Sequence, residues 1–137
     1  MYLIIVPEDY IYCYPTLFKI LDNKLLRKKI SGVIIKKNFF SFKKIIYQIL
    51  INDKLFLINQ FLKRNQQKKY FKDKLESNKK NFFLFTNFIS NEKTLKFIKK
   101  SKAKKLFIIS CDEILKKNII NYFDKAYNLH CSNLPKS

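Results

Sequence analysis

The sequence predicts a three-layer α/β domain built around a mostly parallel sheet. Short apolar runs alternate along the chain with segments of helical periodicity, a pattern typical of strands joined by right-handed crossover helices. The predicted strands occupy residues 2–6, 31–35, 82–85, 105–110 and 127–131. A chain of 137 residues is long enough for a hydrophobic core and is expected to form a single domain, residues 1–137.

The first half of the chain begins with a strand and a helix. Residues 2–6 are apolar without interruption and end at Pro7, as expected for a strand buried on both faces. Pro15 can occupy the first turn of the next helix, whose apolar residues recur at helical spacing. The second strand, residues 31–35, contains Gly32, the only glycine of the chain, and a single glycine excludes GxGxxG and Walker phosphate loops.

Residues 39–71 have the periodicity of one long helix or of two broken ones. Such a helix can cover the sheet, or it can lie as a basic amphipathic helix on an anionic membrane surface. Packing on the sheet is the favoured interpretation, because Lys43, Lys44, Lys54 and Lys63 do not form one continuous charged face.

The third strand follows a polar segment, residues 72–81, which is expected to be a loop. After the strand, Ser90 or Asn91 is expected to cap a helix over residues 92–100. This helix has an acidic residue in its first turn and lysines in its last turn, the distribution that the helix dipole favours.

The carboxyl edge of the predicted sheet collects several polar residues. Asp112 is expected to cap a helix over about 113–123, directly after the fourth strand. The polar residues that follow the predicted strands or end them are Glu8, Asp9, Asp112, Glu113 and His130. Because ligands of open parallel sheets bind at the carboxyl ends of the strands, this pattern predicts a binding site at that edge.

His130 is the only histidine of the chain, and no Cys/His ligand spacing accompanies it, so no metal site is predicted. In a strand over residues 127–131, Asn128 and His130 would share one face and Cys131 would point the other way. Cys131 could not then form a nucleophilic pair with His130 and is expected to be a small buried side chain. From the residues alone, His130 is either a structural residue or a catalytic one.

The segment Asn-Leu-His-Cys-Ser-Asn-Leu-Pro, residues 128–135, resembles the Asn-x-His-x-Ser-Leu-Leu-Pro signature of folate-dependent formyltransferases. These enzymes include the methionyl-tRNA, glycinamide-ribonucleotide and sugar-amine formyltransferases. The matching residues are Asn128, His130, Ser132, Leu134 and Pro135. Residues 106–115 are similar to the strand and loop that precede the signature in this family, and the likeness extends over residues 104–136. It implies a Rossmann-like N-terminal formyltransferase domain that is truncated just after the signature.

The resemblance implies transfer of a formyl group from 10-formyltetrahydrofolate, the co-substrate, to an amine carried by a small molecule or a tRNA. Asn128 would donate a hydrogen bond to the oxyanion that forms when the amine attacks, and His130 would stabilise this charge or pass a proton. The loop residues that would contact the folate pteridine, largely through backbone groups, are Asp112, Glu113, Ile114 and Leu115. The catalytic aspartate of the family has no counterpart after His130, so little or no turnover is expected from this chain alone.

The net charge of +19 permits a second interpretation. A lysine-rich α/β module could bind RNA without catalysis, because 29 basic residues against 10 acidic ones attract nucleic acid non-specifically. Only Arg27 and Arg64 are arginines, and the arginine side chain is the preferred reader of phosphates and bases. The lysines occur in every segment, which favours compositional drift over a dedicated nucleic-acid surface. A tRNA substrate would be attracted by the charge in either case.

The remaining features concern the cellular compartment. The N-terminus has no basic stretch of the kind that opens a secretory signal, and no apolar run approaches the ~18 residues of a membrane span. The 3 cysteines are odd in number and form no CxxC pair, which fits thiols in a reducing cytosol. A cytoplasmic protein is therefore expected, whereas the acceptor amine and the oligomeric state are not specified by the sequence.

Overall fold

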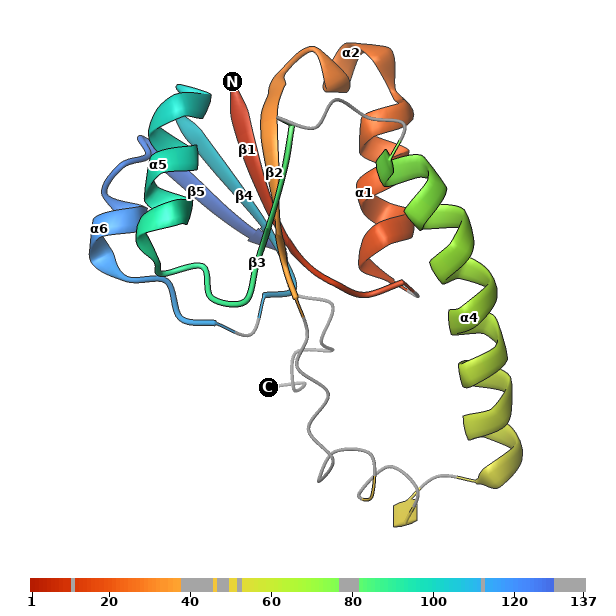
Figure 1. Ribbon diagram of the computed structural model, residues 1–137. Helices are drawn as coiled ribbons and strands as arrows, with labels where there is room; N and C mark the ends of the chain where they lie inside the picture. Colours follow the sequence, from red (N-terminus) through yellow and green to blue (C-terminus); the bar gives the residue numbers. More distant parts are fainter. Residues whose placement is uncertain are drawn as a thin grey trace, which may run out of the picture.

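A computed structural model confirms the α/β class: a five-stranded, all-parallel sheet has helices on both faces, which is a Rossmann-like fold (Figure 1). The structure describes residues 1–10, 12–37, 46, 50–51, 53–76, 82–111 and 113–129. The strands are β1 (Tyr2–Pro7), β2 (Ile30–Lys36), β3 (Phe83–Thr86), β4 (Lys105–Ile109) and β5 (Lys125–Leu129). Their order in the sheet is β3-β2-β1-β4-β5, so the chain first builds outward from β1 on one side and then on the other.

The helices divide between the two faces of the sheet (Figure 1). Their bounds are α1 (Cys13–Asp22), α2 (Lys24–Arg27), α4 (Lys54–Glu76), α5 (Glu92–Ser101) and α6 (Lys117–Ile120). On one face, α1 and the end of α4 pack on the side chains of Ile4, Val6 and Ile35. On the other face, α5 and α6 pack on Ile5 and Ile34. The central strands are buried on both faces, and they are therefore the ones that the uninterrupted apolar runs identify.

Gly32 in β2 permits the close approach of α5 to the sheet. A Cβ atom at this position would lie 3.0 Å from Cζ of Phe97 on α5 and 3.3 Å from Cδ1 of Leu3 on β1. Both distances are below ordinary van der Waals contact. The single glycine therefore serves helix–sheet packing.

The helix α5 begins as the sequence predicts. The side chain of Asn91 accepts a hydrogen bond from the backbone N–H of Thr94 at 2.8 Å, so Asn91 rather than Ser90 is the capping residue. The helix ends at Ser101, and Lys102 follows in the left-handed region with φ 53°. Glu92 in the first turn and two lysines in the last turn agree with the helix dipole.

The prediction for residues 39–81 is only partly correct. The described part of this segment contains one long helix, α4, which continues to Glu76, so the loop predicted over 72–81 is wrong for residues 72–76. Phe71 and Leu75 pack against α1, and Lys74 forms an ion pair of 2.6 Å with Asp22, which together hold the last turns in place. Residues 38–45, 47–49, 52 and 77–81 lie outside the described part of the chain.

The helix predicted over 113–123 is wrong in extent. Only Lys117–Ile120 is helical, and residues 113–116 run ahead of it without helical structure. Two buried residues explain the path, since Leu115 and Ile119 both enter the core beneath α5. Asp112, the expected cap, lies outside the described residues.

The last strand lies two residues earlier than predicted. β5 spans Lys125–Leu129 at one edge of the sheet, and all five of its residues are exposed. An exposed edge strand has no apolar run to mark its bounds, and the strand predicted over 127–131 is corrected accordingly. Residues 130 and 131 lie outside the described part of the chain.

Within the part of the chain that the structure describes, no helix combines the length and the apolar character needed to cross a membrane. The same residues contain no group of three or more His, Cys, Asp and Glu side chains that could hold a metal ion. Cys13 and Cys111 are buried thiols.

Candidate functional site at the carboxyl edge of the sheet

The turn after β4 and the end of β5 meet at the carboxyl edge of the sheet. The backbone N–H of Ser110 donates a hydrogen bond of 2.8 Å to the carbonyl oxygen of Leu129. Ser110 has φ 47°, in the left-handed region that favours glycine. The turn therefore has the backbone conformation of a glycine-containing turn, although serine stands there.

Asn128 lies on β5 in register with Ile108 of β4. Neighbouring residues in register on parallel strands point to the same face, and Ile108 packs on the α5 side of the sheet. Asn128 therefore belongs to the α5 face, where its side chain is exposed. His130 lies outside the described residues, so its pairing with Asn128 stays a prediction.

Glu113, in the loop after β4, forms hydrogen bonds with the loop after β3. Its carboxylate accepts hydrogen bonds from the backbone N–H of Ile89, at 2.9 and 3.1 Å, and from that of Ser90, at 3.0 Å. A carboxylate bound to two backbone N–H groups fixes the relative position of two adjacent loops. The side chain of this predicted pteridine-contact residue thus has a structural role.

The other two described residues of the predicted folate loop differ in their surroundings. Leu115 is buried in the core beneath α5, whereas Ile114 is 93% exposed. The segment is therefore fixed at Glu113 and Leu115, and between them it presents an apolar side chain to solvent. Asp112, the fourth residue of the predicted set, lies outside the described part of the chain.

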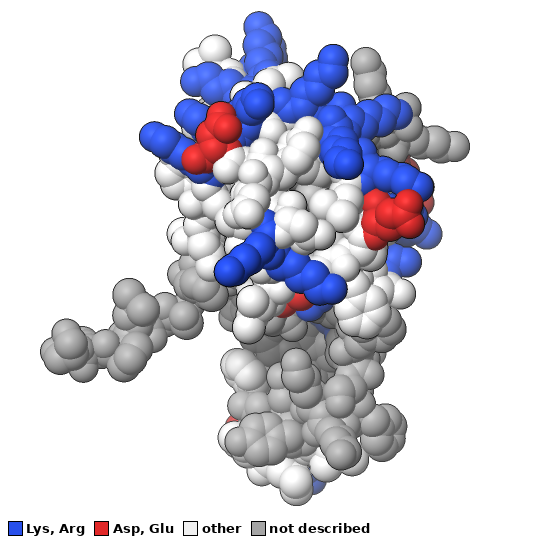
Figure 2. Space-filling view, turned by 90° about the vertical axis from the view of Figure 1, so that its left-hand side faces the viewer, with Lys and Arg blue, Asp and Glu red and all other residues white. Residues whose placement is uncertain are grey.

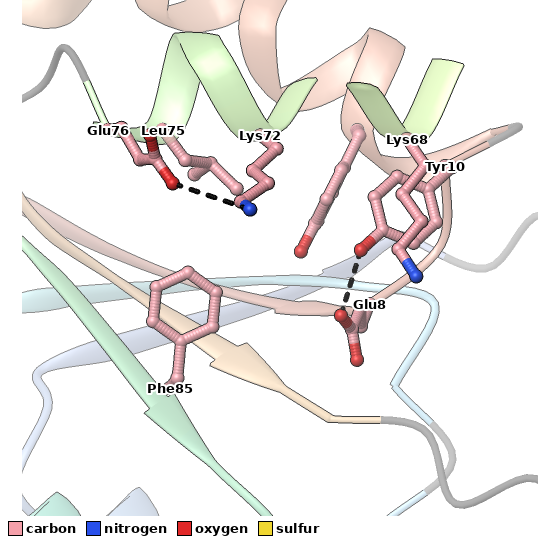
Figure 3. Close-up of a pocket in the computed structure, with 8 residues that line it drawn as sticks. Glu8, Tyr10, Lys68, Lys72, Leu75, Glu76 and Phe85 are labelled. Carbon is pink, nitrogen blue, oxygen red and sulfur yellow. Dashed lines mark hydrogen bonds and ion pairs between the residues drawn. The ribbon is translucent and has the colours of Figure 1, made fainter. Parts of the chain in front are cut away.

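A pocket of about 300 Å³ lies on the other face, between the end of β1 and α4 (Figure 3). Its lining residues are Glu8, Tyr10, Tyr14, Lys68, Lys72, Leu75, Glu76 and Phe85. The hydroxyl of Tyr10 donates to Oε1 of Glu8 at 2.9 Å, and Lys72 pairs with Glu76 at 3.9 Å. Two lysines and two glutamates balance in charge, and aromatic rings form part of the wall.

Both tyrosines of this pocket are held in the neutral phenol form. Burial, followed by the hydrogen bond to Glu8, raises the pKa of Tyr10 to about 12. Burial and, next, the charge of Glu8 raise the pKa of Tyr14 further. The Tyr14 hydroxyl is fully buried, and no hydrogen-bond partner for it occurs within the described part of the chain.

Sequence reasoning placed Glu8 at the carboxyl edge but did not identify the rest of the pocket. Lys68 and Lys72 come from a helix about sixty residues further along the chain, and only tertiary packing brings them near β1. The pocket belongs to the α1/α4 face and Asn128 to the α5 face, so the structure does not bring these two groups together.

Basic side chains gather at the opposite, amino edge of the sheet. Figure 2 shows them at the top of the molecule, the end at which Figure 1 places the N-terminus. The carbonyl oxygen of Met1 accepts from the backbone N–H groups of Lys104 and Lys105, and Tyr2 N–H donates to the carbonyl of Lys29. The lysines of this amino-edge cluster are Lys28, Lys29, Lys102, Lys104, Lys105 and Lys125.

The fold and the edge geometry define the class of protein as a Rossmann-like α/β domain with a candidate ligand site at the carboxyl ends of β4 and β5. Comparisons with protein-family models, with curated proteins and with solved structures found no match to this chain.

Proposed function

We propose that this chain is a formyltransferase-like domain that binds 10-formyltetrahydrofolate for transfer of its formyl group to an amine, with little or no turnover from this chain alone. One observation carries the proposal. The segment that resembles the formyltransferase signature starts on β5 at Asn128, beside the left-handed turn at Ser110, on the carboxyl edge of a parallel sheet. Open α/β sheets bind ligands at this edge, so fold and resemblance independently select the same place.

The proposed chemistry is acyl transfer. The amine nitrogen attacks the formyl carbon, and the electrons of the C=O bond move to oxygen, giving a tetrahedral oxyanion. Asn128 donates a hydrogen bond to this oxygen, a contribution of ~3–4 kcal/mol in typical oxyanion holes. The intermediate then collapses as the bond to the folate nitrogen breaks, and His130 carries the proton from the attacking amine to that leaving nitrogen.

The loop after β4 supports a folate site. Glu113 binds two backbone N–H groups of the neighbouring loop and Leu115 is buried, so the segment is fixed before any ligand arrives. Exposed Ile114 between them provides apolar surface against which a flat pteridine ring can pack. Pre-organisation of this kind lowers the entropic cost of binding.

Binding of a formylated folate tests the proposal. We expect 5-formyltetrahydrofolate, a stable analogue, to raise the melting temperature by about 4 °C when present at about ten times its dissociation constant. Asn128→Ala should weaken this binding by about tenfold or more, because a hydrogen bond to the formyl oxygen is lost. Asn121→Ala, which alters an exposed asparagine in the turn after α6, is the matched control and should bind normally.

Two results would count against this assignment. The first is no melting shift at millimolar 5-formyltetrahydrofolate. The second is a shift that Asn128→Ala and Asn121→Ala leave equally intact, because the ligand would then lie away from the end of β5.

The amino-edge cluster favours a second candidate function, binding of RNA without catalysis. If this is correct, affinity for tRNA should fall by about a hundredfold or more between 50 and 200 mM salt. Replacing Lys102 and Lys104 with glutamate should weaken binding, whereas Asn128→Ala should not. Filter binding over a salt series measures both effects. Binding that survives moderate salt and depends on Asn128 would instead favour formyl transfer to a tRNA amine.

A further inference from the structure

The two halves of α4 have different surroundings. Near its end, Phe71 is buried and stacks on Phe18 of α1 with ring centroids 5.2 Å apart. In the first half, by contrast, large apolar side chains are exposed, Leu55 at 69% and Phe61 at 62%. Figure 1 shows this first half extending away from the sheet, beyond the helices that cover it. Over residues 54–63, about 15 Å of helix, most of the large apolar side chains are therefore exposed to solvent.

Four of the exposed apolar residues lie along one side of this half of the helix, whereas Phe56, which is 51% exposed, lies off that side. Leu55, Ile58 and Leu62 stand at positions i, i+3 and i+7, and Phe61 lies beside Ile58 and Leu62. These four residues are termed the α4 stripe. Phe71 follows Leu62 by nine residues, a rotation of about 180° at 3.6 residues per turn. Leu55, Ile58 and Leu62 therefore face away from the core on which the end of the same helix packs, whereas Phe61 lies at the border between the two sides.

The charges around the α4 stripe restrict what can cover it. No aspartate or glutamate occurs between Lys54 and Lys72. The basic residues of this stretch are Lys54, Lys63, Arg64, Lys68, Lys69 and Lys72. A second copy of the helix would bring an equal positive charge against it, at a cost that opposes self-association. A nucleic acid would satisfy the charge but has no apolar layer to receive leucine, isoleucine and phenylalanine.

An anionic lipid surface can both neutralise the basic residues and receive the apolar side chains of the α4 stripe. Its headgroups attract lysine and arginine, and the acyl boundary beneath them receives an apolar helical stripe. We propose that the first half of α4 lies in the interface of an anionic membrane, with the α4 stripe inserted and the α/β domain held at the surface. Long lysine side chains reach from a half-immersed helix back to the headgroups. The basic residues therefore only need to flank the stripe, and a continuous charged face is unnecessary.

Vesicle sedimentation tests the proposal with the intact chain. We expect binding to vesicles of about three parts phosphatidylcholine and one part phosphatidylserine, weak binding to phosphatidylcholine alone, and loss of binding between about 0.1 and 0.5 M salt. The double variant F61S/L62S should lower the partition coefficient by about tenfold or more. L25S/L26S, which alters two exposed leucines of α2, is the matched control and should bind as the parent does.

Circular dichroism and melting temperature establish that both double variants remain folded, since all four positions are exposed. Three outcomes would overturn the proposal. An equal loss of vesicle binding in F61S/L62S and L25S/L26S would show that the α4 stripe does not contact the membrane. Vesicle binding that K102E/K104E abolishes and F61S/L62S leaves intact would show the same. A dimer or a complex with an acidic protein that F61S/L62S disrupts, without vesicle binding by the parent, would assign the stripe to a protein partner.

Discussion

Phe71→Ala is expected to lower the free energy of unfolding by about 3 kcal/mol and the melting temperature by about 10 °C. Phe71 is 5% exposed, its ring stacks on Phe18 at an interplanar angle of 11°, and it meets the ring of Tyr14 edge-on at a centroid distance of 5.7 Å. Alanine leaves a cavity at the contact that joins α4 to α1. Urea unfolding followed by circular dichroism measures the loss.

The matched control is Phe61→Ala, ten residues earlier on the same helix. Phe61 is exposed, so the change should stay within about 0.5 kcal/mol. Amide hydrogen exchange adds a second measurement, because loss of the Phe71 contact should lower protection along α4 while that of β1 and β2 persists. Equal effects of the two substitutions would contradict the observed docking of α4 through its last turns.

Raising the pH above 10 is expected to destabilise the protein through Tyr14. The pKa of Tyr14 is raised in the folded state by burial and by the charge of Glu8, whereas the ordinary value is 10.0. The stabilisation of the phenol form is therefore complete below pH 10 and is lost as the pH rises toward the folded-state pKa. For this group the loss is about 1.4 kcal/mol for each pH unit above 10.

Tyr10, whose pKa is raised to about 12, acts in the same direction. Its contribution is smaller, because its environment is more open to solvent and charges are screened there. Comparing urea unfolding at pH 8 and at pH 11.5 gives the combined effect.

Tyr14→Phe isolates the contribution of Tyr14. At pH 8 this variant should be as stable as the parent or more stable by about 1 kcal/mol, because a buried hydroxyl without a partner is removed. At pH 11.5 its advantage should grow by about 2 kcal/mol. Tyr12→Phe, at an exposed position, should follow the parent at both pH values. A parent and a Tyr14→Phe variant that lose stability in parallel would show that the hydroxyl does not titrate with unfolding.

The central strands could be predicted because burial on both faces requires an uninterrupted apolar run in the sequence. Residues 3–7 of β1 are all buried, and its apolar run reports this directly. The cap of α5 is equally local, since Asn91 binds a backbone N–H only three residues away. The parallel directions of the strands follow from the helical segments predicted between them, whereas the strand order was not predicted.

The elements whose bounds were predicted incorrectly lack such a local pattern in the sequence. The segment after β4 is not helical at Glu113, because its carboxylate binds N–H groups of Ile89 and Ser90, residues more than twenty positions away. The end of α4 is polar enough to resemble a loop, yet Phe71 and Leu75 hold it against α1. β5 lies at the edge of the sheet, where exposed residues leave the bounds of a strand unmarked.

The sequence by itself determined the class of the fold and the place of Asn128 at the carboxyl edge. Buried parallel strands appear as local apolar runs, and the alternation of strands and helices is visible along the chain. Only the tertiary structure decided that α4 docks through its last turns and leaves the α4 stripe uncovered. It also decided that Tyr14 meets Glu8 and Lys72 in one pocket. These features depend on contacts between segments about sixty residues apart, and the periodicity of a helix does not specify which neighbour its apolar residues meet.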